Sequence, residues 1–100
     1  MNATLIEIFK EKMITNCVVG IFSKTYDSNF IECCGKSGLD FCILDMEHGS
    51  ISYEHLPNLI RACECSGMIP IVRVANNNEE YIGKALDLGA VSYTHLTLPT

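Results

Sequence analysis

The chain has 100 residues, which is enough for one domain, and its hydrophobic fraction of 48% and charged fraction of 19% are those of a globular protein. The net charge of −5 argues against a nucleic-acid partner, because phosphate binding needs a basic face. No apolar stretch is long enough to cross a bilayer and the start does not resemble a secretory signal, so we expect no membrane partner and a cytoplasmic location.

The first half of the chain alternates between helix-like and strand-like patterns. Residues 4–13 predict an amphipathic helix, and the apolar run 17–22 predicts a buried strand. Asp27 can cap a following helix that Gly38 ends. The inward faces of these two helices are expected to carry Leu5, Ile8, Phe9 and Met13 in the first, and Phe30, Ile31 and Cys34 in the second.

The alternation continues with a second strand at 41–44, ending at Asp45, and a third at 69–72, ending at Arg73. Between them a helix begins at Ser52 or nearer Leu56, since Pro57 prefers a first turn. A further helix is predicted after the third strand, with Asn76 and Glu79 as its capping box and Gly89 at its end. Its buried residues are expected to be Tyr81, Ile82, Ala85 and Leu86. A fourth strand is expected to begin near Val91.

This alternation of apolar strands and helices predicts an α/β fold with a parallel sheet. A closed (β/α)₈ barrel and an open doubly wound sheet both fit it. Residues 22–25, after the first strand, lack the GxGxxG phosphate loop, which mildly favours the barrel.

Six cysteines do not indicate a disulfide scaffold in this context. Cys17, Cys34, Cys42 and Cys63 lie in apolar patterns and are interpreted as small buried hydrophobic residues. The pairs at 33–34 and 63–65 lack the CxxC spacing of structural zinc sites.

Charged residues follow two apolar strands at the same expected rim, where parallel α/β folds place their reactive groups. Arg73 could bind a carboxylate or an enolate oxygen, or form a structural ion pair with Asp45 or Glu47. His48 could act as a general base or be a loop histidine bonded to backbone. Asp45 and Glu47 could bind a metal or its waters, or hold His48 and Arg73 in place.

Other polar residues near this rim carry weaker signals. His55, near a helix start, is expected at the surface. Ser23 and Lys24 could contact substrate or belong to a solvated loop, and Tyr53 is expected to pack beside a helix.

Four motifs in order carry a family resemblance: GLDF at 38–41, LDMEHG at 44–49, PIVRV at 70–74 and ALDLGA at 85–90. Together they resemble the HpcH/HpaI aldolase/citrate lyase family, particularly its 4-hydroxy-2-oxoheptanedioate aldolase and 2-dehydro-3-deoxyglucarate aldolase branch. The resemblance runs from about Val18 to Ala90.

The resemblance implies a metal-dependent class II aldolase on a (β/α)₈ barrel. Such enzymes cleave or form 4-hydroxy-2-oxo acids through a pyruvate enolate, with an aldehyde as second substrate and Mg²⁺, Mn²⁺ or Co²⁺ as Lewis acid. It also implies a homo-oligomer, a hexamer in the family.

By position, the resemblance makes Arg73 the residue that binds the keto oxygen of the substrate, and His48 the residue that transfers a proton at the aldol hydroxyl. Asp87 matches the partner of that histidine, although it falls near the end of a helix and would need an irregular barrel or a neighbouring subunit. Asp45 and Glu47 are expected in the second shell of the metal, whose direct ligands we expect on later strands outside this chain.

Residues 91–100 do not match the family's next strand and are expected to be non-native, which leaves 1–90 as the N-terminal part of an aldolase barrel domain, about three βα units after a helix. We therefore expect a truncated chain, inactive by itself. The alternatives are a citrate lyase β-like acyl-CoA lyase, a phosphate-binding barrel enzyme, and a non-catalytic small α/β module.

Overall fold

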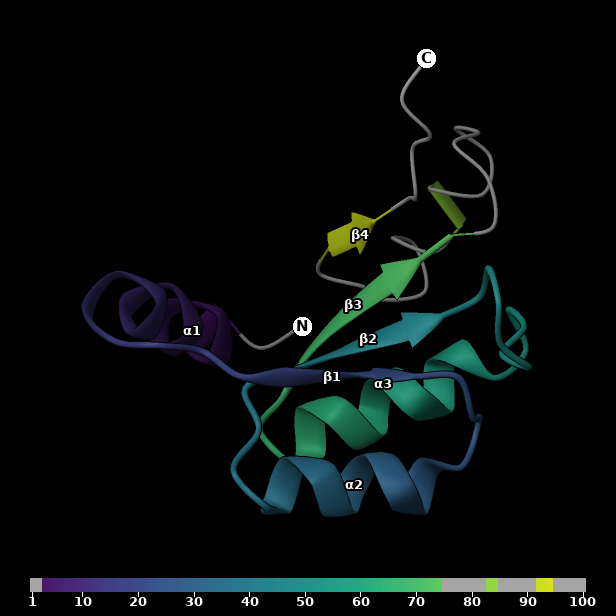
Figure 1. Cartoon of the computed structure of the whole chain (residues 1–100), viewed down its shortest axis with the longest axis horizontal. Helices are drawn as coiled ribbons and strands as arrows, with labels where there is room; N and C mark the ends of the chain where they lie inside the picture. Colours follow the sequence, from purple (N-terminus) through teal and green to yellow (C-terminus); the bar gives the residue numbers. More distant parts are fainter. Residues whose placement is uncertain (1–2, 75–82, 85–91, 95–100) are drawn as a thin grey trace.

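The computed structural model describes residues 3–74, 83–84 and 92–94. A parallel sheet forms one layer, and two helices form a second layer against one of its faces (Figure 1). In chain order the elements are α1 (Ala3–Thr15), β1 (Gly20–Ser23), α2 (Ser28–Lys36), β2 (Phe41–Asp45), α3 (Leu56–Cys65), β3 (Ile69–Arg73) and β4 (Ser92–Thr94).

The order of the strands decides between the two predicted architectures. The sheet runs β1-β2-β3-β4, with every described neighbour parallel. α2 and α3 both lie on one face of it (Figure 1). A doubly wound sheet reverses its strand order and carries helices on both faces, whereas a barrel adds strands in sequence with helices outside. The fold is therefore the first part of a (β/α)₈ barrel.

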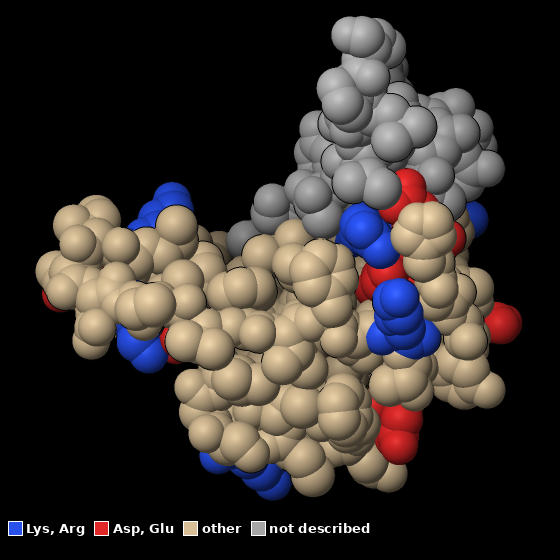
Figure 2. Space-filling view, in the orientation of Figure 1, with Lys and Arg blue, Asp and Glu red and all other residues tan. Residues whose placement is uncertain are grey.

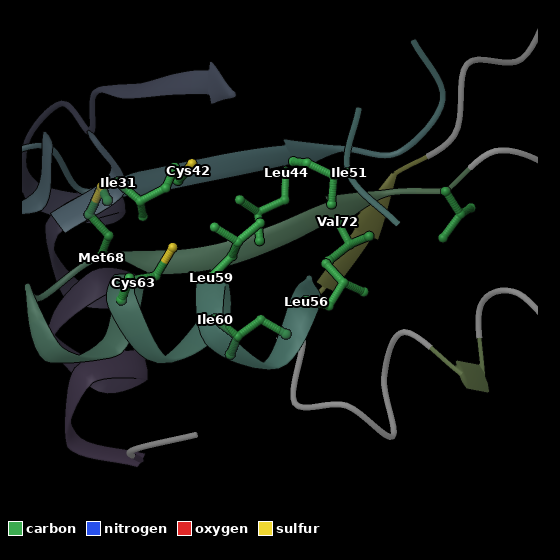
Figure 3. Close-up of a cluster of buried hydrophobic side chains, with 12 residues drawn as sticks. Ile31, Cys42, Leu44, Ile51, Leu56, Leu59, Ile60, Cys63, Met68 and Val72 are labelled. Carbon is green, nitrogen blue, oxygen red and sulfur yellow. The ribbon is translucent and has the colours of Figure 1, made fainter. Parts of the chain in front are cut away.

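The core lies between the sheet and these two helices (Figure 3). Cys42, Leu44 and Val72 point from the strands toward α3. They pack in one cluster with Leu56 and Leu59 of that helix. Burying each of the larger side chains contributes about 1.5–3 kcal/mol. Four residues spaced along one side of α3 are buried in this core: Leu56, Leu59, Ile60 and Cys63.

The opposite face of the sheet carries a second apolar row. Phe22, Ile43 and Ile71 occupy one register position across β1, β2 and β3. Successive strand residues alternate between faces, so this row points away from the helices. Asp45 and Arg73 lie two residues further along the same face, directly opposite each other.

α1 lies at the end of the sheet where the strands begin (Figure 1). It is held there by Asp40, which accepts a hydrogen bond from Lys12 Nζ at 2.8 Å and another from the Val19 backbone at 2.9 Å. These two hydrogen bonds, the Lys12 bond first, lower the pKa of Asp40. The Phe9 ring meets Phe41 edge-on, with centroids 6.2 Å apart.

Several residues predicted to be inward are exposed. In α1, Ile8 and Met13 are 57% and 55% exposed, because this helix touches the sheet over a small area. In α2, Phe30 is exposed because Ile31 and Gly35, one turn apart, form the buried side. Cys17 is also exposed, since β1 begins at Gly20 rather than at residue 17.

The remaining helix boundaries agree with the sequence. The side chain of Asp27 caps α2 by accepting from the Asn29 N–H, as predicted. α3 begins at Leu56 with Pro57 in its first turn, which confirms the later of the two predicted starts. β4 begins at Ser92, close to the predicted Val91, within the segment expected to be non-native. The remaining sequence predictions concern residues that lie outside the described ranges: Asn76, Glu79, Tyr81, Ile82, Ala85, Leu86 and Gly89.

Candidate active site

Asp45 and Arg73 form the centre of the charged cluster at the carboxyl ends of β2 and β3. Arg73 donates from Nε to Asp45 Oδ1 at 3.0 Å and from Nη2 to Oδ2 at 2.6 Å. The Asp45 side chain is fully buried, while that of Arg73 keeps 15% of its surface exposed. This two-point contact fixes the plane of the guanidinium, so the ion pair foreseen as an alternative role for Arg73 is present.

The loop after β2 also closes on Asp45. Its Oδ1 accepts hydrogen bonds from the backbone N–H groups of Glu47 at 2.9 Å and His48 at 3.1 Å. Burial alone would raise the pKa of Asp45, but the Arg73 hydrogen bonds and these two N–H groups outweigh it and lower the pKa. The same contacts raise the pKa of Arg73. The pair is therefore ionised at neutral pH.

Glu47 and His48 lie beside this pair. Glu47 Oε1 is 3.2 Å from His48 Nε2 and 3.7 Å from Arg73 Nε. Neither contact has the geometry of a hydrogen bond, and this buried oxygen has no hydrogen-bond partner among the described residues. An unsatisfied buried acceptor costs about 1–3 kcal/mol, so a donor or a cation at this oxygen would stabilise the site. The His48 side chain is 57% exposed and faces solvent.

The loop after β2 is attached to the loop after β1. Ser50 donates its backbone N–H to the Lys24 carbonyl at 3.0 Å. Between them, a Cβ on Gly49 would lie 2.6 Å from the Asp45 carbonyl oxygen and 2.9 Å from that of Lys24. Only glycine fits this approach, which keeps His48 next to the strand ends.

A phenyl ring completes the surroundings of Arg73. Its guanidinium carbon lies over the Phe22 ring, 5.3 Å from the centroid. Phe22 is 56% exposed, so the ring also faces the space in front of the site. Acidic and basic side chains gather at this end of the sheet, on the right of the space-filling view (Figure 2).

A second contact joins the two rim loops further out. The Tyr26 and His55 rings stack with centroids 4.3 Å apart and planes 5° apart. His55 Nδ1 accepts the Ser52 backbone N–H at 3.0 Å, and its side chain is only 26% exposed. His55, which was expected at the surface, is half-buried, because Tyr26 and Ser52 cover part of it. Ser23 is buried and donates to the Thr25 carbonyl at 3.0 Å, within its own loop.

The structure thus brings together Asp45, Glu47, His48 and Arg73. Asp87 lies outside the described residues, so its role stays a prediction. Sequence reasoning missed Phe22, although an aromatic residue two positions upstream of Lys24 on an alternating strand was a usable signal. No group of three or more His, Cys, Asp or Glu side chains that could hold a metal ion occurs in the described ranges.

The cysteines follow the predicted pattern only in part. Cys42 and Cys63 are buried in the core (Figure 3), Cys34 is half-buried and Cys17 is exposed. A hydrogen bond from Cys63 lowers the pKa of Cys42 and raises that of Cys63 itself.

Within 3–74, 83–84 and 92–94, no helix is long and apolar enough to span a bilayer.

Curated relatives align with most of this chain. No protein-family model matches the sequence. It is 35% identical over 74 residues to 2-dehydro-3,6-dideoxy-6-sulfogluconate aldolase of Pseudomonas putida, covering 74% of this chain and 29% of the relative. It is 29% identical over 91 residues to 2-keto-3-deoxy-L-rhamnonate aldolase of Escherichia coli O17:K52:H18, covering 90% and 34%. The chain therefore spans about a third of the length of these relatives.

Solved structures share the fold. The crystal structure of citrate synthase SbnG matches with a TM-score of 0.79 and 40% identity, over 86% of this chain and 36% of that one. An HpcH/HpaI aldolase from Desulfitobacterium hafniense DCB-2 matches with a TM-score of 0.75 and 24% identity, over 84% and 33%. At that identity the second likeness supports the fold alone.

Proposed function

Because this chain belongs to the HpcH/HpaI aldolase/citrate lyase family, we propose that the protein containing it cleaves or forms 4-hydroxy-2-oxo acids through a pyruvate enolate. The observation that supports this best is Arg73, held by Asp45 at the strand ends. No described residue hydrogen-bonds to its Nη1, which leaves in-plane N–H donors for a substrate. A planar cation in this position suits the vicinal carboxylate and keto oxygens of a 2-oxo acid.

Arg73 has a defined task in this proposal. During retro-aldol cleavage the bond between C3 and C4 breaks, and its electron pair moves onto the keto oxygen as the enolate forms. Arg73 donates hydrogen bonds to that oxygen and stabilises its growing negative charge. Asp45 acts through Arg73, since its two oxygens already accept four hydrogen bonds.

His48 moves the proton that the cleavage releases. Removing the proton from the C4 hydroxyl lets the aldehyde leave, and returning a proton to C3 of the enolate gives pyruvate. The Glu47 carboxylate lies beside this imidazole, with Oε1 3.2 Å from His48 Nε2. We propose Asp87 as a further partner of His48, supplied by a neighbouring subunit of a homo-hexamer.

A divalent cation fits this site in one respect. Glu47 Oε1 accepts no hydrogen bond from the described residues and is a carboxylate oxygen, the ligand type that Mg²⁺ and Mn²⁺ prefer. Glu47 would contact the ion or its waters, whereas Asp45 is fully engaged with Arg73; the direct ligands would come from strands outside this chain. When bound, such an ion supplies Lewis-acid stabilisation of an enolate.

The test is to assay the full-length protein and the 100-residue chain with 4-hydroxy-2-oxo acids, with and without Mg²⁺ or Mn²⁺. We expect pyruvate release from the full-length protein only, lost after treatment with a chelator and reduced about 100-fold in His48→Ala. Turnover by the 100-residue chain would contradict the expectation that the missing two thirds carry metal ligands. A full-length protein that releases no pyruvate from any substrate tried would refute the proposal.

One alternative is favoured by a specific observation. The 40% identity to citrate synthase SbnG allows a condensation of a 2-oxo acid with an acyl thioester. Arg73 would then bind the 2-oxo acid as electrophile rather than as enolate. Release of free CoA thiol with oxaloacetate and acetyl-CoA, without pyruvate release in the aldol assay, would support it.

We also propose a cytoplasmic location and a hexamer for the full-length protein. Light scattering of the full-length protein tests the hexamer.

A further inference from the structure

In the described part of the chain, the Phe22 ring contacts the charged cluster through Arg73, and the function proposed above leaves this ring unused. It belongs to β1, while Asp45 and Arg73 end β2 and β3. Its row on the sheet, with Ile43 and Ile71, leads directly to the Asp45–Arg73 position. In this chain, over half of the surface of Phe22 is exposed.

The contact with Arg73 complements the one made by Asp45. The donors of a guanidinium lie in its plane, and its two faces are weakly hydrated. Asp45 takes the edge formed by Nε and Nη2. Phe22 takes a face, with the guanidinium carbon 5.3 Å from the ring centroid, within the range of a cation–π interaction. An edge and a face together define the orientation of the whole group.

We propose that Phe22 is a positioning residue for Arg73 that keeps the Nη1 edge directed at the 2-oxo acid and excludes water from one face of the guanidinium. The identity of the substrate in this inference rests on the proposed function, whereas the orientation of Arg73 by Phe22 does not. The ring itself touches no reacting atom. Its contribution is to make Arg73 bind the acid in one orientation.

Two different substitutions separate positioning from simple packing. Phe22→Leu keeps an apolar side chain but removes the ring face, whereas Phe22→Tyr keeps the ring. We expect Phe22→Leu to raise the KM for the 2-oxo acid about 3- to 30-fold, the range of a partly desolvated cation–π contact. The KM for the acceptor aldehyde should not change, and Phe22→Tyr should restore the wild-type values. Phe30→Leu, an exposed phenylalanine on α2, is the matched control.

A second readout does not depend on activity. In full-length protein labelled with ¹⁵N-arginine, the Arg73 Nε–H signal should be shifted upfield by the ring and exchange slowly with water. In Phe22→Leu the shift should vanish and exchange should accelerate, while the Arg61 signal stays unchanged. If the enzyme accepts no 2-oxo acid, the proposed function fails, and this measurement still decides the role of Phe22.

Either of two results would overturn the proposal. One is an unchanged KM together with unchanged Nε–H exchange in Phe22→Leu. The other is an equal rise in KM for both substrates that Phe22→Tyr does not reverse, which indicates a general disturbance of the sheet end.

Discussion

Asp45 and Arg73 face each other across β2 and β3 at the last paired position of the two strands, joined by hydrogen bonds of 3.0 and 2.6 Å. Each side chain is the reason the other can be there. A buried carboxylate without a cation would take up a proton, and a guanidinium without the carboxylate would swing toward water. The stability of the strand ends and the proposed activity therefore both depend on this ion pair.

Arg73→Lys should lower kcat/KM about 100- to 1000-fold, because a lysine cannot hold Asp45 at two points and a 2-oxo acid at a third. The measurement is pyruvate release by the full-length protein. Arg61→Lys, an exposed arginine of α3, serves as the control and should retain wild-type rates. Equal rates in Arg73→Lys and Arg61→Lys would remove Arg73 from the site.

Acid should destabilise the protein through Asp45. Folding lowers the pKa of this carboxyl below its ordinary value of 3.8. Its stabilising contribution is therefore complete above that value and is lost as the pH falls through the lower pKa of the folded state. Urea unfolding at pH 6 and near pH 3 should show a fall in stability that is smaller in Asp45→Asn.

The same variant should be less stable than the wild type at pH 6 by about 3 kcal/mol, since it leaves Arg73 without its counter-ion. Asp27→Asn is a suitable control, because the exposed helix cap keeps its acceptor oxygen. If the unfolding free energy depends on pH in the same way in Asp45→Asn and in the wild type, the ion pair with Arg73 does not lower the pKa of Asp45.

Gly49→Ala should separate the two rim loops. The added methyl group would lie 2.6 Å from the Asp45 carbonyl oxygen, a distance that forces the backbone to move. We expect a loss of about 1–3 kcal/mol in unfolding free energy and at least tenfold lower activity. Gly83→Ala is the control, because no atom of the described residues lies within 4 Å of a methyl group there. Wild-type activity in Gly49→Ala would show that the loop tolerates displacement.

Thiol labelling should separate the cysteines by burial. Cys17, Cys33 and Cys65 are exposed and should react with iodoacetamide within minutes under native conditions. Cys42 and Cys63 should react only after unfolding, even though the hydrogen bond from Cys63 lowers the pKa of Cys42. Mass spectrometry of labelled peptides gives the order, and early labelling of Cys42 would mean that the α3 side of the core opens readily.

The sequence was most informative where one residue type has one structural meaning. Pro57 predicted the start of α3, Asp27 predicted that of α2, and the charges after two apolar runs predicted the charged cluster at the ends of β2 and β3. Those signals are local, since a missing N–H, a capping oxygen and a buried strand end act within a few residues.

The errors arose where burial depends on what packs from elsewhere. Cys17 is apolar and follows a helix, but nothing in its neighbourhood tells that pairing with β2 starts only at Gly20. Phe30 is adjacent to Ile31, and the helix turns only one of them inward. The contact between Phe22 and Arg73 spans 51 positions of chain, and local patterns carry no record of such a distance.

The strand order β1-β2-β3-β4 also bears on how the chain is made. Each strand pairs with the one synthesised just before it, so every new βα unit meets a finished edge as it leaves the ribosome. Pairing then closes short loops, which is entropically cheaper than recruiting a distant partner. Asp45 is synthesised 28 residues before Arg73, so its carboxylate can form the ion pair only after β3 has left the ribosome.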